Sequence, residues 1–208
     1  ILESSAISSV SFVGSTPVAK YIYEKAAKNL KRVQSLGGAK NHLVVMPDAN
    51  IDQAVDGIIG AGYGSAGERC MAVSVAVAVG EIADELVEKV HLKSQKLKVA
   101  PWTDPDSDMG PVISREHKEK IENYIATGVE EGADLIADGR NYKIQGYENG
   151  YFIGPTLFDN VKNDMTIYKE EIFGPVLSVI RVPNYEDAID LVNNHAFGNG
   201  TSVYTSDG

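Results

Sequence analysis

The chain contains a single cysteine, Cys70, at the end of a glycine-rich segment. Residues 60–70 read GAGYGSAGERC, with four glycines before the thiol. Such a segment makes a poor helix interior and suits a backbone that a ligand must approach closely. Arg69 stands next to the thiol, and a nearby positive charge stabilises the thiolate, which is the nucleophilic form. A lone thiol has no internal disulfide partner, so Cys70 is either a buried packing residue or a nucleophile.

The segment around Cys70 resembles the nucleophile motif of the aldehyde dehydrogenase superfamily. In that motif a short glycine-rich stretch leads to Gly, then Gln or Glu, one further residue and Cys, and residues 63–71 read YGSAGERCM. Further blocks stand in the order and spacing that the family has. They are residues 12–16 (FVGST), 108–113 (DMGPVI), 154–156 (GPT) and 170–176 (EEIFGPV). The resemblance extends through essentially all 208 residues and implies an NAD-dependent enzyme.

The resemblance implies a role for the residues of these blocks. Cys70 would be the catalytic nucleophile, which carries the substrate as a thioester. Gly14 and Ser15 would belong to the loop that meets the nicotinamide cofactor. Glu171 would accept hydrogen bonds from ribose hydroxyls, and Phe173 would pack against the nicotinamide–ribose end of NAD.

Two positions, Arg69 and Leu36, narrow the choice of substrate and indicate how the thioester is released. Arg69 would bind the carboxylate of a semialdehyde acid, which suits its planar, bidentate guanidinium; a structural salt bridge is the alternative. Hydrolytic members of the family carry a water-activating glutamate where this chain has Leu36, and a leucine cannot accept a proton. With Lys40 in the block LGGAKNH, the chain resembles the methylmalonate-semialdehyde dehydrogenases, which release their product to coenzyme A. The implied reaction is the oxidation of methylmalonate or malonate semialdehyde to propionyl-CoA or acetyl-CoA.

Two other functions remain open. The first is a hydrolytic aldehyde dehydrogenase that obtains its base elsewhere, against which Leu36 argues. The second is a non-enzymatic interaction module on the same fold, against which the joint retention of Cys70, Glu171 and Phe173 argues. Glu68 lies near the thiol in sequence, but we assign it no catalytic role, because the family accepts Gln there and Gln cannot act as a base.

Composition limits the possible partners. The net charge of −10 argues against nucleic-acid binding, and no apolar run approaches the 18 residues of a membrane span. A lone cysteine and the lack of a signal-peptide pattern favour the cytoplasm, or the mitochondrial matrix in a eukaryote. The four histidines show no metal-ligand spacing, so we expect no metal site. They are at positions 42, 91, 117 and 195.

Strand and helix patterns alternate along the chain. Strands are predicted over residues 10–13, 43–46, 72–79, 133–137, 176–182 and 201–205. Helices are predicted after Thr16 as N-cap, after Asn50, around residues 82–90, over residues 115–130 and after Asn184. This alternation predicts an α/β fold with a largely parallel sheet flanked by helices, as in an aldehyde dehydrogenase catalytic domain.

Measured against the family, the chain has two parts. Residues 1–38 would be the C-terminal remnant of the cofactor-binding domain, and residues 39–208 the catalytic domain without its C-terminal segment. We therefore expect a fragment that is inactive alone, because the asparagine that completes the family's oxyanion site lies outside it. A full-length protein of this family would be a homo-oligomer, either a dimer or a tetramer.

Overall fold

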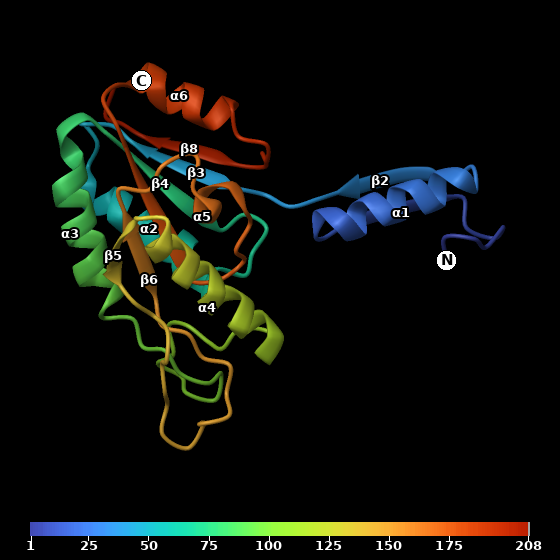
Figure 1. Ribbon diagram of the computed structural model, residues 1–208, viewed down its shortest axis with the longest axis horizontal. Helices are drawn as coiled ribbons and strands as arrows, with labels where there is room; N and C mark the ends of the chain where they lie inside the picture. Colours follow the sequence, from blue (N-terminus) through green and yellow to red (C-terminus); the bar gives the residue numbers. More distant parts are fainter. Residues whose placement is uncertain (208) are drawn as a thin grey trace. The chain divides into compact units, whose positions relative to one another are not determined.

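The computed structural model describes residues 1–207 (Figure 1). It forms two compact units, Ile1–Ala39 and a second unit that starts at Lys40. The first unit consists of strand β1 (Ser9–Val13), helix α1 (Thr16–Lys28) and strand β2 (Arg32–Leu36). The two strands pair in parallel, so this unit is one β–α–β motif.

The predicted N-cap of α1, Thr16, is wrong by one residue. The helix begins at Thr16, and Ser15 is the extended N-cap residue, although its side chain makes no capping hydrogen bond. Thr16 Oγ1 instead accepts a hydrogen bond from the N–H of Gly38 at 3.0 Å. The threonine hydroxyl is thus used to hold the end of β2 near the start of the helix rather than to cap it.

The second unit is built on a six-stranded sheet with the order β5–β6–β7–β4–β3–β8. All neighbouring strands run parallel except β5 and β6, which are antiparallel. This confirms the predicted α/β fold with its largely parallel sheet. The strands are β3 (Asn41–Val45), β4 (Val73–Val79), β5 (Asp134–Ala137), β6 (Thr156–Asp159), β7 (Val176–Val182) and β8 (Thr201–Tyr204).

Helices flank this sheet (Figure 1). They are α2 (Ile51–Tyr63), α3 (Ala83–Ser94), α4 (Arg115–Glu130), α5 (Thr166–Lys169) and α6 (Tyr185–Asn193), with short 3₁₀ turns at Gly64–Gly67 and Gly80–Ile82. The predicted N-caps Asn50 and Asn184 are confirmed, since their side chains accept hydrogen bonds from the N–H groups of Gln53 and Asp187. None of the helices in residues 1–207 combines the length and the apolar character needed to cross a bilayer.

The hydrophobic core lies around the central strands β4 and β7. Nearly every side chain of β3, β4 and β7 is buried, as expected for parallel strands that helices cover on both faces. Helix α2 turns one apolar face towards this core, namely Ala54, Val55, Ile58 and Ile59. Each large aliphatic side chain buried in this way contributes about 1.5–3 kcal/mol. The core thus gives the parallel strands a rigid frame from which loops can project.

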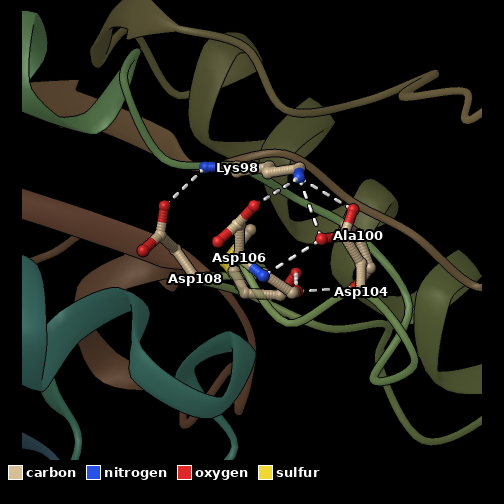
Figure 2. Close-up of polar contacts among 7 residues, drawn as sticks. Lys98, Ala100, Asp104, Asp106 and Asp108 are labelled. Carbon is tan, nitrogen blue, oxygen red and sulfur yellow. Dashed lines mark hydrogen bonds and ion pairs between the residues drawn. The ribbon is translucent and has the colours of Figure 1, made fainter.

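One of these loops lies between α3 and α4 and is rich in aspartate (Figure 2). In this acidic loop, residues 98–109, Lys98 Nζ contacts both carboxylate oxygens of Asp104 at 2.8–2.9 Å. The N–H of Asp106 donates to Asp104 Oδ1 at 3.0 Å, and the N–H of Lys98 donates to Asp108 Oδ2 at 2.9 Å. Ser107 Oγ donates to the carbonyl of Ala100. The loop is therefore held by contacts among its own residues.

Candidate active site

The amino ends of four parallel strands meet at one edge of the sheet in the second unit. Asn41 is the first residue of β3, and Cys70 lies three positions before the first residue of β4. Phe173 stands shortly before β7, and Asn199 shortly before β8. Since β3, β4, β7 and β8 are parallel neighbours, these four residues come from loops at the same edge. Two of these side chains, Asn41 and Asn199, thereby reach the carbonyl of Cys70.

The segment that carries the thiol, residues 64–72 (the nucleophile loop), has an unusual backbone. Ser65 and Ala66 have φ angles of 53° and 54°, and Gly67 has a φ of 69°, so three consecutive residues are left-handed. A Cβ atom at Gly67 would lie 2.1 Å from the carbonyl oxygen of Gly174. Only glycine permits this approach, which brings the nucleophile loop against the residue that follows Phe173.

Cys70 lies in a turn at the end of this loop. The N–H of Ala72 donates to the carbonyl of Arg69 at 3.0 Å, so Cys70 and Met71 are the two central residues of the turn. Cys70 is exposed, and it is the free cysteine of the described chain. A turn of this kind presents the thiol outward, as a nucleophile requires, and the thiol is not part of the core.

Arg69 is also exposed, and its Nε donates to Ser65 Oγ at 2.9 Å. Within residues 1–207 its guanidinium forms no ion pair with a carboxylate, so the structural salt bridge considered above is not formed there. The arginine therefore keeps donors that are free to bind an anion beside the thiol.

Lys40 holds the segment that leads to the predicted cofactor residues. Its side chain is buried, and Nζ donates to the carbonyls of Ile167 at 2.7 Å and Glu170 at 2.8 Å. Burial lowers the pKa of this amine to about 7, although the charges of Glu171 and Glu170 act in the opposite direction. The two carbonyls lie at the end of α5, so Lys40 fixes the backbone immediately before Glu171.

Glu68 and His117 connect the nucleophile loop to Phe173. Glu68 Oε1 accepts a hydrogen bond from the N–H of Ile113 at 3.2 Å and lies 3.4 Å from His117 Nε2. The same Nε2 donates to the carbonyl of Phe173 at 2.7 Å, which requires a proton on Nε2. Burial raises the pKa of Glu68, and the Ile113 N–H and His117 oppose that shift. This arrangement gives Glu68 a tethering role between the nucleophile loop and the segment around Ile113 and His117.

Glu171 and Phe173 are both accessible in the second unit. Phe173 has a φ of 58° and is 38% exposed. Glu171 is half-buried, and its carboxylate makes no hydrogen bond or ion pair with the residues the structure describes. An acceptor carboxylate beside an exposed aromatic ring has the chemistry to hold a ribose and the flat ring attached to it. These residues therefore suit the nicotinamide–ribose end of NAD.

The other predicted cofactor residues lie in the first unit. The N–H of Gly14 donates to the carbonyl of Leu36 at 3.1 Å, so the ends of the parallel strands β1 and β2 are joined. Ser15 follows directly and precedes α1, a position where helix N–H groups can meet an anion. Leu36 is 53% exposed. The structure thus groups Gly14, Ser15 and Leu36 on one unit and groups Cys70, Arg69 and Phe173 on the other.

Several residues of the site were not predicted from the sequence. Asn41 donates from Nδ2 to the carbonyls of Cys70 and Ala72, and Asn199 Nδ2 donates to the Cys70 carbonyl as well. Lys40 and Asn41 belong to the block that matched the family, and that match was the signal that could have drawn attention to them. His117 and Asn199 stand in segments without a comparable pattern.

Comparisons with known proteins identify the family of the chain. Residues 1–208 match the profile of the Aldehyde dehydrogenase family. The chain is 53% identical over 209 residues to a malonate-semialdehyde dehydrogenase of Pseudomonas aeruginosa, an alignment that covers all of this chain and 42% of that protein. A solved methylmalonate-semialdehyde dehydrogenase of Oceanimonas doudoroffii is similar, with 55% identity, a TM-score of 0.97 and coverage of 100% of this chain and 43% of that one.

A Sinorhizobium meliloti 1021 protein, assigned as a methylmalonate-semialdehyde dehydrogenase and solved in complex with NAD, is similar along the whole chain. It shows 57% identity and a TM-score of 0.98, and this chain covers 43% of its length. The chain therefore spans less than half the length of the relatives that it matches.

Proposed function

Because the chain belongs to the aldehyde dehydrogenase family, we propose that it carries the nucleophile of an NAD-dependent, CoA-acylating dehydrogenase of malonate or methylmalonate semialdehyde. The observation that supports this most strongly is the exposed Cys70 in a left-handed loop that contacts the Phe173–Gly174 segment. The domain assignment belongs to the same proposal: residues 1–38 serve the cofactor-binding domain, and residues 39–208 serve the catalytic domain.

Cys70 begins the reaction as a nucleophile. Its thiolate attacks the aldehyde carbon, a carbon–sulfur bond forms, and the carbonyl oxygen becomes an oxyanion. The N–H of Cys70 is the donor that this chain offers to that oxyanion. NAD, when bound, supplies the acceptor for the hydride that leaves the same carbon. The acyl group then remains on Cys70 as a thioester.

Other residues of the chain orient the reactants. Arg69 binds the substrate carboxylate, which supports a semialdehyde acid rather than a neutral aldehyde. Glu171 accepts hydrogen bonds from the ribose, and Phe173 packs against the nicotinamide–ribose end of the cofactor. Gly14 and Ser15 contribute the loop before α1 on the cofactor-binding side.

The leucine at position 36 supports release to coenzyme A rather than to water. A leucine cannot take a proton from water, so the acyl group passes to the ionised thiol of coenzyme A, and Cys70 leaves as a thiolate. Propionyl-CoA and acetyl-CoA have one carbon fewer in their acyl groups than the substrates, so the substrate carboxylate leaves as CO₂, and the carbon that carried it takes a proton from water. The protein acts as a homo-oligomer, and its lone unpaired thiol supports a reducing compartment such as the cytoplasm.

The dependence on coenzyme A tests this proposal. In the intact protein that contains this chain, NADH should form in a single burst when coenzyme A is absent and continuously when it is present. The variant Leu36→Glu should gain steady turnover without coenzyme A and release free acid, and Leu36→Gln, which has no basic carboxylate, should not. Fast turnover of the unmodified protein without coenzyme A would instead support the hydrolytic alternative.

A further inference from the structure

The carbonyl oxygen of Cys70 is held by two side-chain amides from separate strands. Asn41 Nδ2 donates to it at 2.9 Å, and Asn199 Nδ2 donates to it at 2.7 Å. A carbonyl oxygen has two lone pairs, so these two donors satisfy it completely. Asn41 lies at the start of β3, and Asn199 lies just before β8, which pairs with β3.

We propose that Asn199 is a positioning residue that sets the orientation of the nucleophile through the Cys70 carbonyl. The peptide unit is planar, so a fixed carbonyl direction fixes the plane that contains the Cα of Cys70. Because the turn bond from Ala72 to Arg69 also restrains the backbone on both sides of Cys70, rotation about the Cα–C bond, and with it the direction of the bond to the thiol-bearing Cβ, is restricted. The catalytic part of this inference rests on the proposed function; the structural part concerns the hydrogen bond alone.

The nucleophile loop needs such a contact from outside. Its three left-handed residues precede Cys70, and regular pairing of β4 begins only at Val73. Between them, the one backbone hydrogen bond that spans Cys70 is the turn bond from Ala72 to Arg69. A single turn bond leaves the Cys70 peptide free to rotate, and the two amides remove that freedom.

Asn199 itself adopts a strained backbone to make the contact. Its φ angle is 122°, in a region that residues other than glycine rarely occupy. The residues on either side are anchored: the carbonyl of Gly198 accepts a hydrogen bond from the N–H of Lys40, and the N–H of Gly200 donates to Asn41 Oδ1 at 2.9 Å. Backbone strain of this kind persists only where the surrounding contacts hold the residue in place. Here the contacts on both sides of Asn199 hold its amide against the carbonyl of Cys70.

The carbonyl of Cys70 can be observed directly. In the intact protein that contains this chain, [1-¹³C]cysteine labels this carbonyl, the resonance that is missing from Cys70→Ala identifies it, and its ¹³C shift reports the hydrogen bonds to the oxygen. Asn199→Gly removes the amide and also relieves the positive φ, so the fold should be retained. Asn141→Gly is the matched control, since Asn141 is an exposed asparagine with a φ of 59°.

The proposal predicts that the labelled carbonyl resonance moves upfield in Asn199→Gly and stays in place in Asn141→Gly, with thermal unfolding unchanged in both. An unmoved resonance in Asn199→Gly would overturn it. If that variant does not fold, Asn199→Asp is used in its place, because a carboxylate keeps the shape but cannot donate. The same upfield shift is expected, and its absence in the folded variant would overturn the proposal.

The catalytic part is tested in the intact protein. Asn199→Gly should lower kcat about tenfold or more and leave KM for the aldehyde nearly unchanged, because misplacement of the nucleophile affects the transition state rather than binding. An unchanged kcat alongside a shifted resonance would overturn the positioning role. Failure of the proposed function would be seen separately, as turnover that survives the loss of Cys70, and would leave the carbonyl result intact.

Discussion

The nucleophile loop and the acidic loop are held in opposite ways. The nucleophile loop is bound by residues that lie 29, 45 and 129 positions away in sequence, namely Asn41, Ile113 and Asn199. The side-chain contacts of the acidic loop in Figure 2 span at most 10 positions. The first loop depends on the assembled sheet, whereas the second is built from its own residues.

This difference explains what each loop can do. A loop held by distant residues can keep a conformation that its own sequence would not choose, such as the left-handed run at Ser65, Ala66 and Gly67. A loop held by exposed ion pairs gains little from each pair, because water and salt screen the charges. Strain and precise placement are therefore found beside Cys70, and ordinary surface electrostatics beside Lys98.

Two lysines show the same contrast. Lys40 is buried against two backbone carbonyls with no carboxylate within 4 Å among the described residues, and burial lowers its pKa. Lys98 is exposed and pairs with Asp104 and Asp106, and the hydrogen bond with Asp104 raises its pKa. The same side chain thus supports the backbone near the site in one place and orders a surface loop in the other.

The largest expected effect is the loss of the thiol. In the intact protein, Cys70→Ala should reduce aldehyde oxidation by several orders of magnitude, because the covalent route is removed. Its unfolding transition should stay where it is, since Cys70 is exposed. Asp104→Asn, in the acidic loop, is the control and should retain full turnover. Near-normal turnover in Cys70→Ala would contradict the comparison, because neither the nucleophile loop nor the acidic loop would then be needed for catalysis.

The next effect concerns the close approach at Gly67. Gly67→Ala should lower the free energy of unfolding by about 2–4 kcal/mol, because the new methyl group meets the Gly174 carbonyl and the backbone is left-handed. Gly132→Ala shares a positive φ but has no atom within 4 Å of its Cβ position, so about 1 kcal/mol is expected. Urea unfolding of both variants measures the difference. Equal losses of unfolding free energy in the two variants would show that the close approach to the Gly174 carbonyl does not contribute to the effect.

A smaller effect should separate the two lysines by pH. Between pH 7 and 10.5 Lys40 is deprotonated in the folded chain and protonated in the unfolded chain, so its contribution to stability rises with pH. The free energy of unfolding should therefore rise with pH for the wild type relative to Lys40→Met. For Lys98→Met the difference in free energy of unfolding from the wild type should stay constant over that range. A lysine whose pKa is raised by folding loses its contribution to stability only above pH 10.5. Parallel pH profiles for the two variants would contradict the account of Lys40.

The smallest effect is expected in the acidic loop itself. Asp104→Asn removes an exposed ion pair with Lys98, so the melting temperature should fall slightly at low salt and match the wild type at high salt. The rate of Cys70 alkylation by iodoacetamide should not change. An alkylation rate that follows this substitution would mean that the acidic loop is coupled to the nucleophile loop after all.

Much of the fold followed from the sequence because its signals are local. The run Val176–Val182 is strongly β-forming, and Asn50 and Asn184 are capping residues directly before apolar helical faces. Strand β2 was missed because its sequence, RVQSL, alternates exposed and half-buried side chains with few apolar residues. Strand β6, which reads TLFD, was missed because it follows directly on Gly154 and Pro155, residues that are typical of turns and loops.

The positions of the site residues were harder to predict than their identities. The motif around Cys70 is contiguous and could be recognised, but the hydrogen bonds that hold it come from the starts of other strands. Nothing near Asn199 in the sequence indicates that its amide reaches a carbonyl 129 residues earlier. Likewise, the left-handed Ser65 and Ala66 are not glycines, so their backbone could not be anticipated from residue type.

The most direct test of the account is to capture the acyl group. The intact protein would be incubated with NAD and malonate semialdehyde in the absence of coenzyme A, digested, and analysed by mass spectrometry. We predict an acyl thioester on the peptide that contains Cys70, which disappears when coenzyme A is added before digestion. NADH formation without any adduct on Cys70, or with an adduct on another residue, would contradict the assignment of this loop as the site of catalysis.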